Sequence, residues 1–184
     1  MPSKEVRYAV VGLGHISQVA VLPAFEHASR NSELSALVSD DKEKLRKLGK
    51  KYDVANSHGY DDYEALLASG EIDAVYIALP NSLHKDFAIK AARAGVHVLC
   101  EKPMAVTAEQ CRAMIDAAEA NGVKLMIAYR LHFEKINMEV AELVRRGVIG
   151  EPRFFASSFS QSVVEGDVRL MPLEKGGGSV YDMG

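Results

Sequence analysis

Short apolar stretches alternate with helical patterns along the first two thirds of the chain. The apolar stretches have the length of strands, and the amphipathic or charged segments between them are long enough to form helices. The first apolar stretch runs from Val6 to Val11 and only Arg7 interrupts it, as in a strand covered on both faces. Strands that alternate with helices pair in parallel through right-handed crossovers. The sequence therefore predicts an α/β fold with a doubly wound parallel sheet of the Rossmann type.

The pattern assigns approximate boundaries to each element. Strands are expected at 6–11, 34–38, near Val54, and at 73–79, 96–100 and 124–128. Helices are expected at 16–29, 41–52, 62–68 and 82–94, and from Thr107 to a stop at Gly122. Gln110 follows Thr107 by three residues, which is a capping-box pattern that marks a helix start.

The character of the sequence changes after Ala128. A further helix is expected to end at Gly147, and 152–160 is expected to be the first strand of an antiparallel sheet. One strand and a short tail do not make a stable sheet, so we expect this second domain to be cut short. The predicted organisation is a dinucleotide-binding Rossmann domain at 1–128 and the incomplete start of a C-terminal substrate and oligomerisation domain at 129–184.

Composition excludes several classes of protein. The chain is 48% hydrophobic and 26% charged with a formal net charge of -3, which is ordinary globular composition. This charge balance gives no reason to expect nucleic acid or a membrane surface as partner, and no apolar run reaches the length of a membrane span. We expect no signal peptide, no disulfide between Cys100 and Cys111, no metal site and a cytoplasmic location.

A glycine-rich turn follows the first strand directly. In the segment Gly12-Leu13-Gly14-His15-Ile16-Ser17, the first glycine permits a tight turn and the second lets the backbone approach a pyrophosphate at a helix N-terminus. Ser17 stands where such turns usually have glycine or alanine. The position between a strand and a helix near the chain start favours dinucleotide binding, and a plain structural turn is the alternative.

The residues after the second strand bear on which dinucleotide binds. Ser39 falls where an acidic residue would accept hydrogen bonds from the adenosine ribose, and a serine there leaves room for a 2′-phosphate. Lys42 and Lys44 would add positive charge, so NADP is favoured. NAD remains the alternative, with Asp40 on the ribose, and the two lysines would then form a solvated helix face.

Two more groups of residues follow strands at the edge where open parallel sheets place their ligands. They are Leu79, Pro80, Asn81 and His84 after one strand, and Glu101, Lys102 and Pro103 after the next. Lys102 would polarise a hydroxyl or carbonyl oxygen while a hydride moves to or from nicotinamide. Taken singly, Lys102 would be a surface lysine and His84 an ordinary residue at a helix start.

Taken in order, these motifs resemble those of one enzyme family. The set comprises Gly12-x-Gly14, Pro80-Asn81-x-x-His84, Glu101-Lys102-Pro103, the segment 129–134 with Asn137, and the segment 176–184 that contains Asp182. In this order and spacing the whole chain is similar to the Gfo/Idh/MocA oxidoreductases, with its closest likeness to the glucose–fructose oxidoreductase branch.

The resemblance implies an N-terminal Rossmann domain and a C-terminal open antiparallel sheet that makes oligomer contacts. It implies that Lys102 is catalytic, that Lys102–Pro103 is a cis peptide, and that Asp182 is a second residue of the substrate site. The family's third such residue would fall two positions beyond Gly184. Ser17 departs from the family pattern.

The same resemblance implies a function. The branch commonly uses NADP with a serine at the position of Ser39 and a lysine at that of Lys44. We therefore expect hydride transfer between nicotinamide and a sugar (pyranose) or polyol, in a homo-oligomer when full-length. Tyr129 and Arg130 would contact nicotinamide or substrate, with a packing residue and a surface cation as the alternative. The rival functional hypothesis is a non-catalytic NAD(P)-binding sensor or regulator on the same fold.

Overall fold

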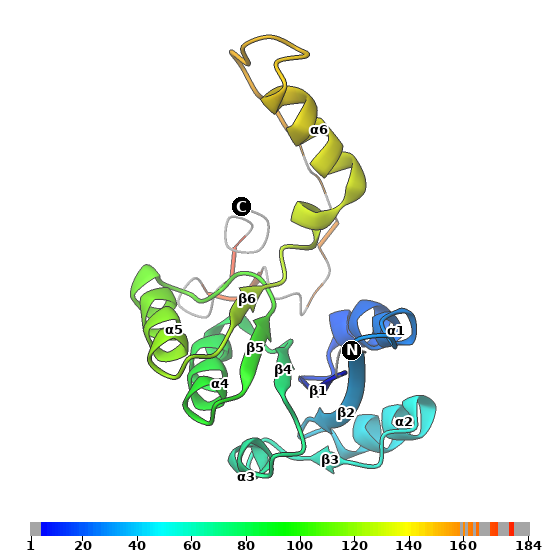
Figure 1. Cartoon of the computed structure of the whole chain (residues 1–184). Helices are drawn as coiled ribbons and strands as arrows, with labels where there is room; N and C mark the ends of the chain where they lie inside the picture. The colour runs from blue at the N-terminus through cyan, green and yellow to red at the C-terminus, as the bar shows by residue number, and fades with distance from the viewer. Residues whose placement is uncertain are drawn as a thin grey trace.

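A computed structural model describes residues 5–158, 160, 162–163, 165, 170–172 and 177–178. Six parallel strands form one sheet in the order β3-β2-β1-β4-β5-β6 (Figure 1). The strands are β1 Val6–Val11, β2 Ser32–Val38, β3 Ser57–His58, β4 Ala74–Ile77, β5 His97–Cys100 and β6 Leu125–Ile127. The helices are η1 Ser17–Val21, α1 Leu22–His27, α2 Lys42–Tyr52, α3 Tyr63–Ala68, α4 Asn81–Arg93, α5 Ala108–Ala120, η2 Arg130–Phe133 and α6 Lys135–Arg145. The predicted doubly wound fold is confirmed.

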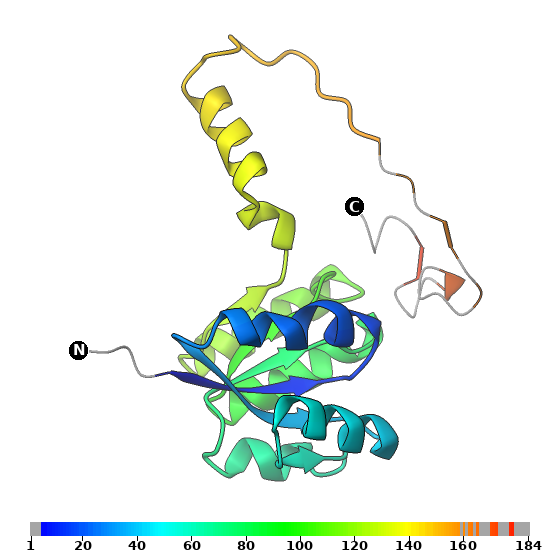
Figure 2. The ribbon, with the colours of Figure 1, turned by 90° about the vertical axis from the view of Figure 1, so that its right-hand side faces the viewer.

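Alternation along the strands sends side chains into two separate cores. Ala9 and Val11 of β1 face a cluster with residues of α3, α4 and α5, whereas Val10 faces a cluster with residues of η1, α1 and α2. All three side chains are fully buried, as expected for a central parallel strand. Figure 2 shows the layers from the side. The two cores hold the strands rigidly, and the turns at the strand ends are therefore fixed in place.

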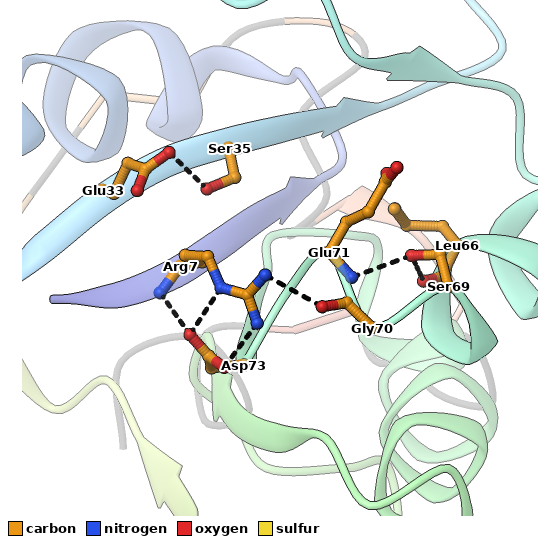
Figure 3. Close-up of polar contacts among 8 residues, drawn as sticks. All are labelled: Arg7, Glu33, Ser35, Leu66, Ser69, Gly70, Glu71 and Asp73. Carbon is orange, nitrogen blue, oxygen red and sulfur yellow. Dashed lines mark hydrogen bonds and ion pairs between the residues drawn. The ribbon is translucent and has the colours of Figure 1, made fainter. Parts of the chain in front are cut away.

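Arg7, the one charge in the first apolar stretch, is explained by an ion pair at the amino-terminal edge of the sheet. Its Nε and Nη2 donate to the carboxylate of Asp73 at 2.9 and 2.8 Å, and its Nη1 donates to the carbonyl oxygen of Gly70 at 2.8 Å (Figure 3). The hydrogen bond with Asp73 is the main reason that the pKa of Arg7 is raised. This cluster joins the starts of β1 and β4, at the sheet edge opposite to the predicted site.

The third strand lies three residues beyond its expected place near Val54. Val54 is buried because it packs beside α2, where its N–H donates to the carbonyl oxygen of Gly49 at 2.9 Å. Asp53 has a φ of 55° and ends that helix in the left-handed conformation. The apolar residue thus belongs to the end of a helix, and the pairing strand is Ser57–His58.

Beyond β6 the chain leaves the sheet. In both views α6 projects away from the sheet domain, and its side chains are exposed or half-exposed (Figures 1 and 2). Residues 152–158 form no strand, contrary to the expectation for 152–160, because none of the described strands lies beside them to pair. The domain division at 128 stays a prediction.

Among the residues that the structure describes, no helix combines the length and the apolar character that crossing a membrane would require.

Candidate functional site

Four of the predicted turns lie together at the carboxyl ends of adjacent strands. Main-chain ladder bonds continue into them, since Gly12 donates to the carbonyl of Val38 at 2.9 Å and Glu101 donates to that of Ile77 at 2.9 Å. The strand order reverses between β1 and β4, and an open sheet has its ligand crevice at such a reversal. The turns after β2, β1, β4 and β5 therefore face one crevice.

The two glycines of the turn after β1 have different surroundings. A Cβ on Gly12 would lie 2.4 Å from the carbonyl oxygen of Ala78, and Gly12 has a φ of 93°. A Cβ on Gly14 would meet no protein atom within 4 Å, and Gly14 is exposed. Gly12 is thus required by the fold, while the space beside Gly14 is open, as the prediction of a pyrophosphate against its backbone requires.

Ser17, the departure from the glycine pattern, is fully buried beneath this turn. Its hydroxyl donates to the carbonyl oxygen of Gly12 at 2.6 Å. A small side chain is needed there for close helix–strand contact, and the hydroxyl adds a hydrogen bond that holds the turn closed. Ser17 opens a π-helical turn, and such turns are frequent at functional sites. His15 is exposed beside the turn and Ile16 is half-buried.

The turn after β2 places Ser39 and Asp40 in different environments. Ser39 is buried, and its Oγ accepts a hydrogen bond from the N–H of Asp41 at 3.2 Å. Asp40 is exposed, and its Oδ1 accepts from the N–H of Tyr60 at 2.9 Å. The Asp40 carboxylate already holds the loop after β3, which favours Ser39 for the residue beside the ribose.

Lys44 is held by the residue that caps α2. Asp41 Oδ1 accepts from the N–H of Lys44 at 3.0 Å, and Asp41 Oδ2 lies 3.1 Å from Lys44 Nζ. The backbone hydrogen bond from Lys44 is the main reason that the pKa of Asp41 is lowered. A bound phosphate would share this lysine with Asp41.

The turn after β4 leads into α4, and its residues are packed unequally. Leu79 and Asn81 are buried, whereas Pro80, which precedes the first turn of α4, is exposed. Pro80 is the N-cap of this 13-residue helix and makes no side-chain capping bond, so no Pro80 side-chain group satisfies the first backbone N–H groups of α4.

His84 lies one turn into α4 and is fully buried. Its Nδ1 lies 2.8 Å from the carbonyl oxygen of Pro103, and its Nε2 lies 2.9 Å from that of Leu79. Burial lowers the pKa of His84, against the opposing effects of these carbonyls and of the Glu101 carboxylate. His84 thus lies at a helix start, as one alternative has it, and it also contacts both turns of the crevice.

This burial makes stability depend on pH. The unfolded chain takes up a proton near pH 6.5, the ordinary pKa, while folded His84 does so only at lower pH. The contribution of His84 to the free energy of unfolding is thus complete above the pKa of the unfolded state. It is lost as the pH falls from there toward the pKa of the folded state, by up to about 1.4 kcal/mol per pH unit. Urea unfolding at pH 7.5 and 5.5 should show a smaller loss for His84→Gln than for the wild type. Parallel losses would contradict the assignment, and His27→Gln, at an exposed position, is the control.

Glu101 is a buried carboxylate that accepts two hydrogen bonds within the described part of the chain. Tyr76 Oη donates to its Oε1 at 2.8 Å, and the N–H of Lys102 donates to its Oε2 at 3.2 Å. Burial and the Glu101 charge raise the pKa of Tyr76, so its hydroxyl stays protonated and donates. Tyr76 was not predicted. The only signal for it was a hydroxyl in an otherwise apolar strand, where a buried polar group needs a partner.

Lys102 and Pro103 form the turn that follows. The Lys102–Pro103 peptide is cis, which confirms the expectation. Lys102 is half-buried, and its main-chain N–H donates to the carboxylate of Glu101. This places the lysine at the carboxyl end of β5, next to the turn that carries Leu79 and Pro80 in the neighbouring strand.

Arg130 and Tyr129 follow β6 and are exposed. They border a hollow of about 390 Å³ that runs along the α1 side of the sheet, between Phe25, Tyr76 and Leu99. Of the predicted site residues that the structure describes, Glu101 and Arg130 line this hollow, whereas the glycine turn, Ser39 and Lys102 do not. Asp182 and most of the segment 176–184 lie outside the described residues.

Within the described ranges, no three His, Cys, Asp or Glu side chains are grouped so that they could hold a metal.

The chain is similar to known oxidoreductases in sequence. The profile of a family described as "Oxidoreductase family, NAD-binding Rossmann fold" matches residues 6–129. A D-xylose 1-dehydrogenase (NADP(+)) of Haloferax volcanii is 36% identical over 179 residues, which cover 96% of this chain and 53% of that protein. The scyllo-inositol 2-dehydrogenase (NADP(+)) IolU of Bacillus subtilis is 35% identical over 85% of this chain and 46% of its own length.

Solved structures show the same likeness. The 3-ketoreductase KijD10 of Actinomadura kijaniata, in complex with NADP and TDP-benzene, superposes with a TM-score of 0.87 at 32% identity over 98% of this chain and 54% of that one. The aldose–aldose oxidoreductase of Caulobacter crescentus gives a TM-score of 0.75 at 42% identity over 78% of this chain and 43% of that one. The chain thus spans about half the length of the relatives it matches.

Proposed function

Since this chain belongs to the Gfo/Idh/MocA oxidoreductase family and matches its NAD-binding Rossmann fold, we propose that the protein transfers a hydride between NADP and a sugar or polyol. The observation that carries this proposal is the gathering of the glycine turn, Ser39 and Lys102 along one sheet edge. Relatives named as NADP-dependent dehydrogenases of xylose and of an inositol support the cofactor and the substrate class.

The site residues have two functions in this proposal, since one group binds the dinucleotide and Lys102 transfers a proton. The turn at Gly12 and Gly14 holds the pyrophosphate, and Ser39 with Lys44 contacts the 2′-phosphate. Bound nicotinamide would accept or supply the hydride. Lys102 polarises the reacting oxygen and moves its proton, because a lysine ammonium stabilises charge that develops on that oxygen.

Several residues take supporting roles in this proposal. Asp182 orients the substrate, on the ground of the sequence motif alone. Leu79, Pro80 and Asn81 line the nicotinamide side of the crevice, and Arg130 lies at its outer rim. Exposed apolar side chains on α6, at Ile136, Met138 and Val140, support a homo-oligomer. The unpaired cysteines support a reducing compartment, in keeping with the cytoplasm.

A coenzyme titration tests the dinucleotide assignment. We expect NADPH to bind at least about tenfold more tightly than NADH, because Lys44 adds a charge-assisted contact to the 2′-phosphate. The double variant Ser39→Asp with Lys44→Ala should remove or reverse this preference, since a carboxylate repels phosphate and accepts from ribose hydroxyls. The measurement is the change in NADPH and NADH fluorescence on binding.

The control for this experiment is Lys50→Ala, at the other end of the same helix, which should keep the preference. Preference of the wild type for NADH would move the ribose contact to Asp40. Binding of neither coenzyme would contradict the proposed site.

A further inference from the structure

His84 connects two turns that the proposed mechanism assigns to different tasks. Leu79 belongs to the turn after β4, beside the dinucleotide, and Pro103 follows Lys102 in the turn after β5. The carbonyl oxygens of Leu79 and Pro103 lie 2.9 and 2.8 Å from opposite ring nitrogens of one imidazole. The two turns are separated by more than twenty residues of sequence, and this ring bridges them directly.

The ring is built into its place. His84 has no exposed surface, and it belongs to the same buried layer as Ala88 and Ala91 further along α4. A carbonyl oxygen only accepts hydrogen bonds, and a neutral ring carries a single N–H, so the ring donates to one of the two carbonyls while its other nitrogen lies against the second. Main-chain carbonyls of buried turns need such donors, because an unsatisfied buried acceptor is costly.

We propose that His84 is a positioning residue, which keeps the coenzyme-side turn and the Lys102–Pro103 turn in register because its buried ring lies between them, with one ring nitrogen against each turn. This inference rests on the proposed function, since it assigns Lys102 and the dinucleotide to these turns. Hydride transfer needs the reacting groups within a narrow range of positions, and a shift of about 1 Å costs on the order of a hundredfold in rate. His84 acts through Lys102 and Leu79 and touches neither substrate nor reacting atoms.

Two conservative substitutions separate the two links. The side-chain amide nitrogen of asparagine falls near the position of Nδ1, and that of glutamine falls near the position of Nε2. His84→Asn therefore keeps a nitrogen against the Pro103 carbonyl and loses the contact with Leu79. His84→Gln keeps a nitrogen against the Leu79 carbonyl and loses the contact with Pro103.

The kinetic test is a split between kcat and KM in the active enzyme. We expect His84→Gln to lower kcat about tenfold or more, with a smaller change in KM for NADPH, because the lysine turn is released. His84→Asn should raise KM for NADPH more than it lowers kcat. Equal changes of kcat and KM for NADPH in both variants, or no change in either variant, would overturn the proposal. His27→Gln is the control and should match the wild type.

A spectroscopic test does not depend on turnover. In ¹⁵N-labelled protein, at least one ring N–H proton of His84 should be protected from exchange, as expected for a buried donor, and His84→Asn or His84→Gln should abolish its signal. A His84 ring without any protected N–H proton would overturn the bridge, even if the enzyme is active. A protected proton in a protein that turns over no sugar or polyol would leave the bridge standing and refute the proposed function.

Discussion

Replacement of Lys102 by methionine is expected to reduce turnover of the sugar or polyol by at least about a thousandfold, because it removes both the charge near the reacting oxygen and the proton carrier. Methionine has nearly the same length and keeps the packing of the side-chain stem. The N–H of residue 102 still donates to Glu101, so the turn after β5 should keep its shape. NADPH affinity should therefore stay close to that of the wild type. Steady-state kinetics and a fluorescence titration on the same preparation measure the two effects.

The matched control is Lys124→Met, an exposed lysine at the amino-terminal edge of the sheet before β6. It should leave both turnover and NADPH affinity unchanged. Retained turnover in Lys102→Met would refute the catalytic role. Coenzyme binding by a wild-type protein that oxidises and reduces no sugar or polyol would favour the sensor hypothesis over the enzyme.

The backbone of the site follows from local sequence patterns. A buried parallel strand reads as a short apolar run, so the ends of β1 and β4 could be placed within two residues of their observed positions. Residues just beyond these ends then had to share one edge of the sheet. The identity of Gly12 as a required glycine also follows, because a tight turn there forces a positive φ.

Side-chain partners could not be predicted in the same way. Tyr76 and Glu101 meet because β4 and β5 are neighbours in register, which depends on the strand order and not on spacing along the chain. The capping box at Thr107 was half right. Thr107 Oγ1 accepts from the N–H of Gln110 as expected, whereas Gln110 Oε1 accepts from Val106 and not from Thr107.

His84 shows the same limit most clearly. Its position in the sequence fits any residue in the first turns of a helix, and only the fold brings Pro103 to its other ring nitrogen. The phosphate contact of Lys44 is predicted from its charge and from the family resemblance, whereas its pairing with Asp41 depends on how α2 begins. Strand ends depend on local hydrophobicity, but pairwise contacts depend on tertiary structure.

A pair of alanine substitutions in the glycine turn separates folding from coenzyme binding. Gly12→Ala should destabilise the protein by about 3 kcal/mol, from overpacking and from a positive φ that alanine disfavours. Its Cβ would lie 2.4 Å from a main-chain oxygen, which cannot rotate away as a flexible side chain would. The turns after β1 and β4 would have to move apart. Urea unfolding followed by circular dichroism measures the loss.

Gly14→Ala should leave the free energy of unfolding nearly unchanged, because its Cβ meets no protein atom within 4 Å and no positive φ opposes it. The methyl group would instead occupy the space where the backbone approaches the pyrophosphate. We therefore expect NADPH affinity to fall by about tenfold or more, since close contact between backbone N–H groups and phosphate oxygens is prevented. Normal NADPH binding by a fully folded Gly14→Ala protein would show that the pyrophosphate does not lie on this turn. An unfolding free energy unchanged by Gly12→Ala would show that the two turns are not packed together in solution.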